Sequence, residues 1–179
     1  MGKAMAMERM NNLDWEKIRS YVKLAVYAIC KDEIVDVEQW VECFTEADYC
    51  CVLDTGSKDG TLEYLVEAQK THPNLIVECG FITPWRFDLA RNASMTLIPK
   101  DTVIYFMADL DEIIKEPGWV QKVKDTWEPM FDRGMYPYNR DVDGDTIIRQ
   151  IPEYRFHSKE WAKWVNVVHE ALVDRKGDK

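Results

Sequence analysis

Two aspartates one residue apart, Asp109 and Asp111, follow an apolar run at residues 102–108. Alternate side chains of an extended strand share a face, so these two carboxylates can point the same way, about 6.6 Å apart along the backbone. Neighbouring carboxylates repel each other unless a cation or strong hydrogen-bond donors lie between them. One interpretation is a divalent cation that carries a phosphate-bearing ligand. The other is a strand that runs out into a solvated acidic turn, and the pair alone favours neither.

Asp54 also ends an apolar run, the strand predicted at residues 49–53. The segment that follows, residues 54–61, contains two glycines and several short polar side chains, which is typical of a loop. It matches neither the Walker phosphate loop nor the dinucleotide pattern G-x-G-x-x-G. At this position Asp54 could accept hydrogen bonds from a base imide or a ribose hydroxyl, or it could cap the turn.

Asp88, Arg91 and Asn92 lie at positions i, i+3 and i+4 of a predicted helix and therefore share one of its faces. The apolar residues of that helix are expected mainly on the other side. The polar face could position a nucleotide phosphate or a base edge. It could equally carry only a surface salt bridge, which contributes little to stability.

His169 ends the apolar run at residues 164–168, much as the paired aspartates end theirs. An imidazole added to carboxylates suits manganese or another transition metal better than calcium. A single histidine is more often a structural residue, so the position alone does not assign it to a metal.

Apolar runs that alternate with amphipathic segments must hold these residues in place. Strands are predicted at residues 23–30, 49–53, 75–79 and 102–108. Between them lie helical patterns, such as Val37, Trp40 and Phe44 at i, i+3 and i+7. Pro117 suits the first position of the last helix. This alternation predicts an α/β fold with a doubly wound, mostly parallel sheet.

The pattern changes after about residue 134, where Asp143-Gly144 separates two extended segments and predicts an antiparallel hairpin. A further extended stretch covers residues 153–157. We therefore expect one domain. Its parts are a lead-in at residues 1–22, an α/β half at 23–134, a C-terminal antiparallel extension at 135–174 and a tail at 175–179.

The composition of the 179-residue chain excludes several classes of protein. A net charge of −9 argues against nucleic-acid binding as the main function. No apolar stretch approaches the roughly 20 residues that span a bilayer, so no transmembrane segment is expected. The five cysteines form no C-x-x-C pair and lie mostly in apolar runs. This usage predicts reduced core thiols in a cytoplasmic protein.

Taken together, five segments in this order resemble a family 2 glycosyltransferase, an inverting enzyme with the GT-A type of Rossmann-like, nucleotide-sugar-binding fold. The matching segments are residues 28–33, 53–61, 85–92, 107–112 and 168–170. The resemblance extends over roughly residues 23 to 172. Each segment is weak evidence by itself, and the order and spacing of all five carry the resemblance.

The resemblance implies nucleotide-binding roles for several residues. Asp54 is similar to the acid that holds the nucleotide base, usually uracil, and Glu33 lies in the first matching segment. Asp88, Arg91 and Asn92 are similar to residues of the helix that flanks the base and the phosphates. The implied ligand is a nucleoside-diphosphate sugar, with UDP as the expected nucleotide.

The resemblance also implies a metal site. Asp109 and Asp111 resemble the D-x-D element, in which the first acid lies near the ribose and the metal and the second binds the metal directly. His169 resembles the histidine that often completes the site. We therefore expect Mn²⁺ or Mg²⁺ as the cofactor, held by Asp109, Asp111 and His169.

Inverting transfer requires one general base on the acceptor side and no enzyme nucleophile. Glu170 is the candidate because it adjoins His169, with Asp141, Asp143 and Glu153 as alternatives. The acceptor is not assigned, because family members usually extend further than this chain does after the histidine. A partner subunit, as in a homo-oligomer, could supply the missing surface.

Two other functions remain open. A sugar-phosphate nucleotidyltransferase shares a similar sheet and also uses metal-bound acids. It normally carries a Gly-rich basic loop after the first strand, where this chain has Lys31-Asp32-Glu33. A nucleotide-sugar-binding module without turnover is the other alternative.

Overall fold

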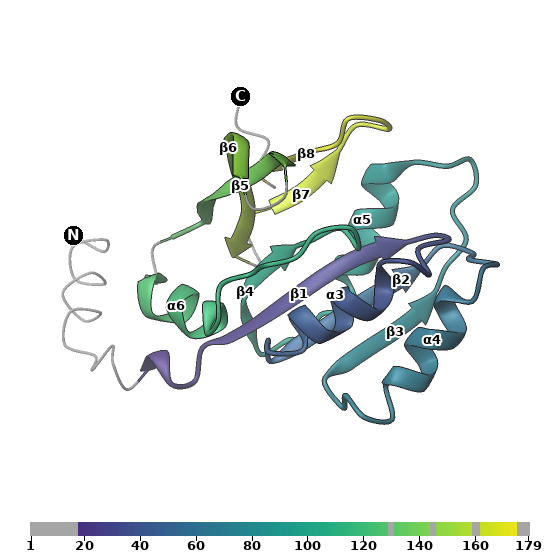
Figure 1. Cartoon of the computed structure of the whole chain (residues 1–179), viewed down its shortest axis with the longest axis horizontal. Coiled ribbons are helices and arrows are strands. Elements are labelled where there is room, and N and C mark those ends of the chain that lie inside the picture. The colour runs from purple at the N-terminus through teal and green to yellow at the C-terminus, as the bar shows by residue number, and fades with distance from the viewer. Residues whose placement is uncertain (1–17, 129–130, 144–145, 159–161, 175–179) are drawn as a thin grey trace, which may run out of the picture.

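Four parallel strands form the centre of the sheet in the computed structural model, which describes residues 18–128, 131–143, 146–158 and 162–174. These strands are β1 (Lys23–Cys30), β2 (Tyr49–Asp54), β3 (Leu75–Cys79) and β4 (Thr102–Met107). Two long antiparallel strands, β5 (Arg133–Asp143) and β6 (Thr146–Ser158), extend the sheet beyond β4. The order is β3-β2-β1-β4-β6-β5, and a separate hairpin consists of β7 (Ala162–Val165) and β8 (Ala171–Asp174) (Figure 1).

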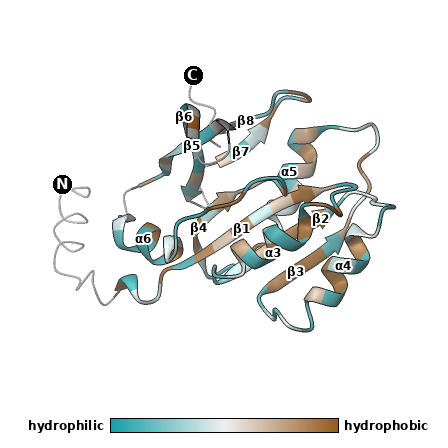
Figure 2. Ribbon diagram, in the orientation of Figure 1, coloured by the Kyte–Doolittle hydropathy of each residue, from teal (hydrophilic) through white to brown (hydrophobic). Residues whose placement is uncertain are grey.

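The central strands are buried on both faces, which explains their nearly continuous apolar sequences. Alternate residues of β1 enter two different cores: Leu24 and Val26 join one cluster, and Ala25 and Tyr27 join the other. Figure 2 shows the hydrophobic residues concentrated along these inner strands.

Helices cover both faces of the sheet. Three helices contribute to the larger cluster: α3 (Val37–Phe44), α4 (Thr61–Ala68) and α6 (Trp119–Thr126). On the opposite face, α5 (Phe87–Met95) and the β7–β8 hairpin pack over β1, β2 and β4. The predicted doubly wound, mostly parallel α/β fold with an antiparallel C-terminal extension is confirmed.

The strand order creates a switch point. From β1 the chain moves outward through β2 to β3, and then crosses back to place β4 on the other side of β1. In an open α/β sheet the connections diverge at such a point and leave a crevice at the carboxyl ends of the strands, where ligands bind. The segments after β1 and β4, which carry Glu33 and Asp109, border this crevice.

Two local predictions differ from the structure. Pro117 is not the first residue of the last helix: α6 starts at Trp119, and its N-cap is Gly118 with a positive φ of 68°, a conformation that favours glycine. The predicted stretch at residues 153–157 is not a separate strand but part of β6, which pairs with β4. None of the helices in the described residues is long and apolar enough to cross a membrane.

Candidate active site

A cavity of about 680 Å³ opens at the carboxyl ends of the four parallel strands. We call it the switch-point cavity. Segments after every one of these strands line it, and they contribute Lys31 and Glu33, Thr55, Phe81 and Thr83, and Asp109 and Asp111. Helix α5 adds Phe87 and Arg91. Its volume lies within the range of small-molecule and cofactor sites.

Arg91 is the central cation of the site. Its side chain is buried, yet its guanidinium lies 2.8 Å from Asp109 and 2.7 Å from Glu170. It also contacts the sulfur of Met107 at 3.1 Å. Burial acts to lower the pKa of Arg91, but the two carboxylates outweigh burial and raise it. Arg91 therefore links the end of β4 to the β7–β8 hairpin as a permanently charged group.

Arg155 on β6 is a second cation that the sequence analysis did not single out. It pairs with Glu112 and lies 3.5 Å from the other carboxylate oxygen of Asp109. Burial raises the pKa of Glu112, although Arg155 acts against it. The sequence contained one indication of Arg155. It directly precedes Phe156 in an extended stretch, where a charged residue next to an apolar one can point toward a buried site. Nothing in the local pattern, however, indicates that its partners are about 45 residues away.

Glu33 and Asp111 differ from these paired acids. Both line the switch-point cavity, and neither forms an ion pair or a side-chain hydrogen bond with the residues that the structure describes. Partial burial raises the pKa of Glu33, and the neighbouring charges of Asp111 and Asp36 raise it further. The cavity therefore contains two carboxylates without an ion-pair partner among the described residues, although Lys31 also belongs to its lining.

The described residues contain no group of three His, Cys, Asp or Glu side chains arranged to hold a metal ion. The structure accordingly does not gather Asp109, Asp111 and His169 into such a group, and Asp109 is already bound to Arg91. A hard cation such as Mg²⁺ can instead be held by one or two carboxylates together with substrate phosphates. The unpaired carboxylates of Glu33 and Asp111 fit that arrangement.

Replacing Glu33 by glutamine is expected to stabilise the ligand-free protein at pH 7. Because the pKa of Glu33 is raised from its ordinary 4.5 in the folded state, the glutamate favours folding most at low pH and loses that contribution as the pH rises. The melting temperature of the variant should therefore exceed that of the wild type at pH 7 and approach it near pH 4. A lower melting temperature at pH 7 would show that Glu33 has a stabilising partner.

Asp54 lies behind the wall of the cavity and is only 1% exposed. One carboxylate oxygen accepts hydrogen bonds from the backbone N–H groups of Gly56 and Ser57 at 2.8 and 3.0 Å. The other lies 3.5 Å from the thiol of Cys30. Asp54 thus caps the loop after β2, and it positions Thr55 in the wall of the cavity. Its direct contact with a nucleotide base stays a prediction.

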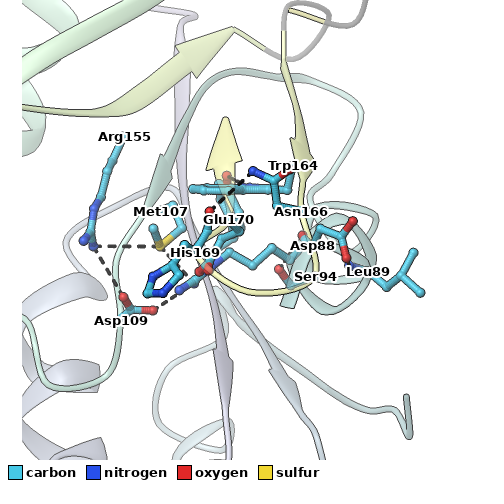
Figure 3. Close-up of polar contacts among 12 residues, drawn as sticks. Asp88, Leu89, Ser94, Met107, Asp109, Arg155, Trp164, Asn166, His169 and Glu170 are labelled. Atoms are coloured by element: carbon cyan, nitrogen blue, oxygen red, sulfur yellow. Dashed lines mark hydrogen bonds and ion pairs between the residues drawn. The ribbon is translucent and has the colours of Figure 1, made fainter. Parts of the chain in front are cut away.

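The helix face with Asp88, Arg91 and Asn92 is not a solvent-exposed face, because Asp88 and Arg91 are both buried. Of the three, only Arg91 lines the switch-point cavity. The Asp88 carboxylate pairs with Arg86 and is drawn beside Leu89, away from Asp109 (Figure 3). The hydrogen bond with Arg86 lowers the pKa of Asp88.

Asn92 links α5 to strand β7. Its side chain donates to the carbonyl of Trp164 at 2.9 Å and accepts from the N–H of the same residue at 3.0 Å. The amide of Phe87 also donates to Val167 in the β7–β8 turn. Helix α5 therefore fixes the hairpin that carries His169 and Glu170.

His169 and Glu170 lie at the end of the β7–β8 turn. His169 is exposed and has a positive φ of 55°. Figure 3 draws its ring on the Asp109 side of the hairpin, whereas Glu170 is engaged by Arg91. Among the alternative bases, Glu153 is partly exposed on β6. The side chains of Asp141 and Asp143 lie outside the described part of the structure.

No protein-family model and no curated protein matches the sequence. Among solved structures, the chain is similar to the mannosyltransferase PcManGT of Pyrobaculum calidifontis, solved in complex with GDP-Man and Mn²⁺. The identity is 21% and the TM-score 0.53, over 64% of this chain and 35% of that one. It is also similar to TarS of S. aureus, with 16% identity and a TM-score of 0.51, over 63% of this chain and 21% of TarS.

This chain thus spans about a third or less of the length of these solved structures. At such identities the likeness concerns the fold. The strand order, the helices on both faces and the similarity to the mannosyltransferase agree: the chain has the Rossmann-like α/β fold of a glycosyltransferase.

Proposed function

We propose that this chain acts as a metal-dependent glycosyltransferase. It would bind a nucleoside-diphosphate sugar, with UDP as the nucleotide, and transfer the sugar with inversion to an acceptor. The observation that carries the proposal is the switch-point cavity. Unpaired acids from the segments after β1 and β4 face the same space there, at the edge where α/β sheets bind ligands.

The two ends of the cavity differ in chemistry. The segments after β2 and β3 contribute a hydroxyl group at Thr55 and an aromatic ring at Phe81, which suit a nucleoside. The segments after β1 and β4 contribute Glu33, Asp109 and Asp111, which suit a cation with a diphosphate. A nucleoside-diphosphate sugar laid across the strand ends would satisfy both.

The cation would be Mn²⁺ or Mg²⁺, held by Asp111 with Glu33 or Asp109, and His169 is the nearby imidazole candidate. When bound, such an ion neutralises the negative charge that grows on the departing diphosphate. The Mn²⁺ and GDP-Man in the mannosyltransferase of similar fold support this choice of ligand class. Arg91 would keep Asp109 fixed at the border of the site, because it holds one carboxylate oxygen at 2.8 Å.

Inversion requires a single displacement at the anomeric carbon and therefore one proton acceptor near the acceptor hydroxyl. Glu170, the residue that the sequence predicts for this role, is close to Asp109 through their shared partner Arg91. Because the Glu170 carboxylate already forms an ion pair with Arg91, another residue could act as the proton acceptor.

A panel of nucleoside diphosphates with and without Mn²⁺ tests the proposal by thermal shift. At 100 times its dissociation constant a ligand stabilises the folded state by about 2.7 kcal/mol, which corresponds to several degrees of melting temperature for a chain of this size. We expect the largest shift for UDP with Mn²⁺, and a smaller one for UMP, which lacks the diphosphate. A panel in which no nucleoside diphosphate raises the melting temperature would refute the proposal.

A binding module without turnover is the second candidate, because the carboxylate of Glu170, the predicted general base, is already paired with Arg91. Release of UDP from UDP-sugars in the presence of Mn²⁺ separates the two functions. Binding without release would favour the module. Binding of a nucleoside triphosphate together with a sugar phosphate would instead favour a nucleotidyltransferase.

A further inference from the structure

A second cavity of about 370 Å³ lies between β6 and the β7–β8 hairpin. We call it the hairpin cavity. It shares Arg91 and Asp109 with the switch-point cavity, so the two spaces meet at this ion pair. A ligand in the hairpin cavity would therefore adjoin one bound near Asp109 in the first.

The lining of the hairpin cavity is polar but balanced in charge. Three arginines line it, together with three carboxylates, those of Asp109, Glu153 and Glu170. Arginine forks and carboxylates form directional hydrogen bonds with vicinal hydroxyl groups, since one donates and the other accepts. A strongly charged ligand of either sign would face an equal number of like charges here, so a neutral ligand rich in hydroxyl groups fits better.

Tyr154 adds a flat apolar surface to this lining. Tyr154 is 48% exposed as a whole residue, and the guanidinium of Arg133 on β5 lies 4.8 Å from the centroid of its ring. A sugar ring has an apolar face of C–H groups as well as hydroxyl groups at its edge. A half-exposed tyrosine ring beside arginines and carboxylates therefore matches a saccharide more closely than a lipid chain or a peptide.

The carboxylates of the hairpin cavity are not equally available. Glu170 lies 2.7 Å from Arg91, and Asp109 lies 2.8 Å from the same residue. Glu153 has only a long contact in the described structure, 3.9 Å to Arg155, and its side chain is 31% exposed. It is thus the cavity carboxylate that could accept a hydrogen bond from an incoming hydroxyl without first breaking a short ion pair.

We propose that the hairpin cavity binds a neutral saccharide acceptor and that Glu153 takes the proton from its attacking hydroxyl; this assignment rests on the proposed glycosyltransferase function. The acceptor oxygen forms a bond to the anomeric carbon of the donor sugar. The bond from that carbon to the diphosphate oxygen breaks, and its electron pair leaves with the nucleoside diphosphate. The hydroxyl proton passes to the Glu153 carboxylate.

Saccharide binding can be tested without turnover. Methyl glycosides of glucose, galactose, mannose and N-acetylglucosamine would be examined by saturation-transfer-difference NMR with the full chain. We expect signal from at least one glycoside, and its loss in Tyr154→Ala. Tyr21→Ala, which removes a 74% exposed tyrosine that does not line the cavity, is the matched control and should keep the signal. Absence of any signal from the wild type overturns the saccharide assignment.

The role of Glu153 is tested by transfer from UDP-sugar to the glycoside that binds. Glu153→Gln should lower the transfer rate at least 100-fold, as expected for loss of a general base. Its affinities for UDP and the glycoside should change less than threefold. Glu67→Gln, at an exposed site on α4, should keep full activity. Transfer that persists in Glu153→Gln, but is lost in Glu170→Gln with both ligands still bound, overturns the assignment.

These experiments also separate this inference from the proposed function. Failure of every nucleoside diphosphate to bind rejects the glycosyltransferase, and with it the acceptor role, whatever the glycosides do. Binding of UDP with Mn²⁺ but of no glycoside keeps the proposed function and rejects the saccharide cavity.

Discussion

Replacing Asp111 by asparagine is expected to weaken binding of UDP in the presence of Mn²⁺ about 100-fold, or about 2.7 kcal/mol. Asp111 is exposed, lines the switch-point cavity and has no ion-pair partner among the described residues. Its charge is thus available to a cation, whereas Asp109 already faces Arg91. Asparagine keeps the size of the side chain and removes the charge, so the effect should fall on the cation and its diphosphate ligand rather than on folding.

Calorimetric titration of UDP, with and without Mn²⁺, measures this effect. Asp125→Asn is the matched control, because Asp125 is an exposed aspartate on α6 away from the cavity. A comparison with Asp54→Ala is also informative, because this change removes the loop cap and should weaken UDP while the dependence on Mn²⁺ persists. Equal affinities of Asp111→Asn and the wild type in Mn²⁺ would remove Asp111 from the metal site.

Replacing Arg91 by glutamine is expected to lower the free energy of unfolding by about 3 kcal/mol. The change removes the shared cation between Asp109 and Glu170 and leaves two acids close together without their main counterion. The guanidinium is almost fully buried, so the expected loss of stability falls in the range found when one partner of a buried ion pair is removed. We use the lower end of that range because Asp109 is about one-third exposed.

Urea denaturation of the variant and the wild type at pH 7 measures the difference. Arg86→Gln is the control, because the Arg86–Asp88 pair is more exposed at its arginine and should contribute less to stability than the buried Arg91 network. The double variant Arg91→Gln, Glu170→Gln should recover part of the lost stability, since it removes one of the two carboxylates that the single variant leaves without this counterion. If Arg91→Gln is as stable as Arg86→Gln, the network does not anchor the β7–β8 hairpin.

Local sequence was enough to predict the scaffold of the site. Continuous apolar runs can be buried on both faces only as inner strands, and their alternation with amphipathic helices implies parallel connections. Parallel strands end at a common edge. In the structure the segments after β1 and β4, with Glu33, Asp109 and Asp111, accordingly lie at the same edge of the sheet and line one cavity.

The tertiary structure decided which partners these groups have. Arg91 meets Glu170, 79 positions away, and Arg155 meets Glu112, 43 positions away, because β6 pairs with β4 and α5 packs on β7. It also decided that Asp54 faces its own loop and that Glu153 is left with only a distant cation. Such differences depend on distances of a few ångströms between segments remote in sequence. Periodicity and residue type specify which face a side chain occupies, but not which charge from another element comes to lie against it.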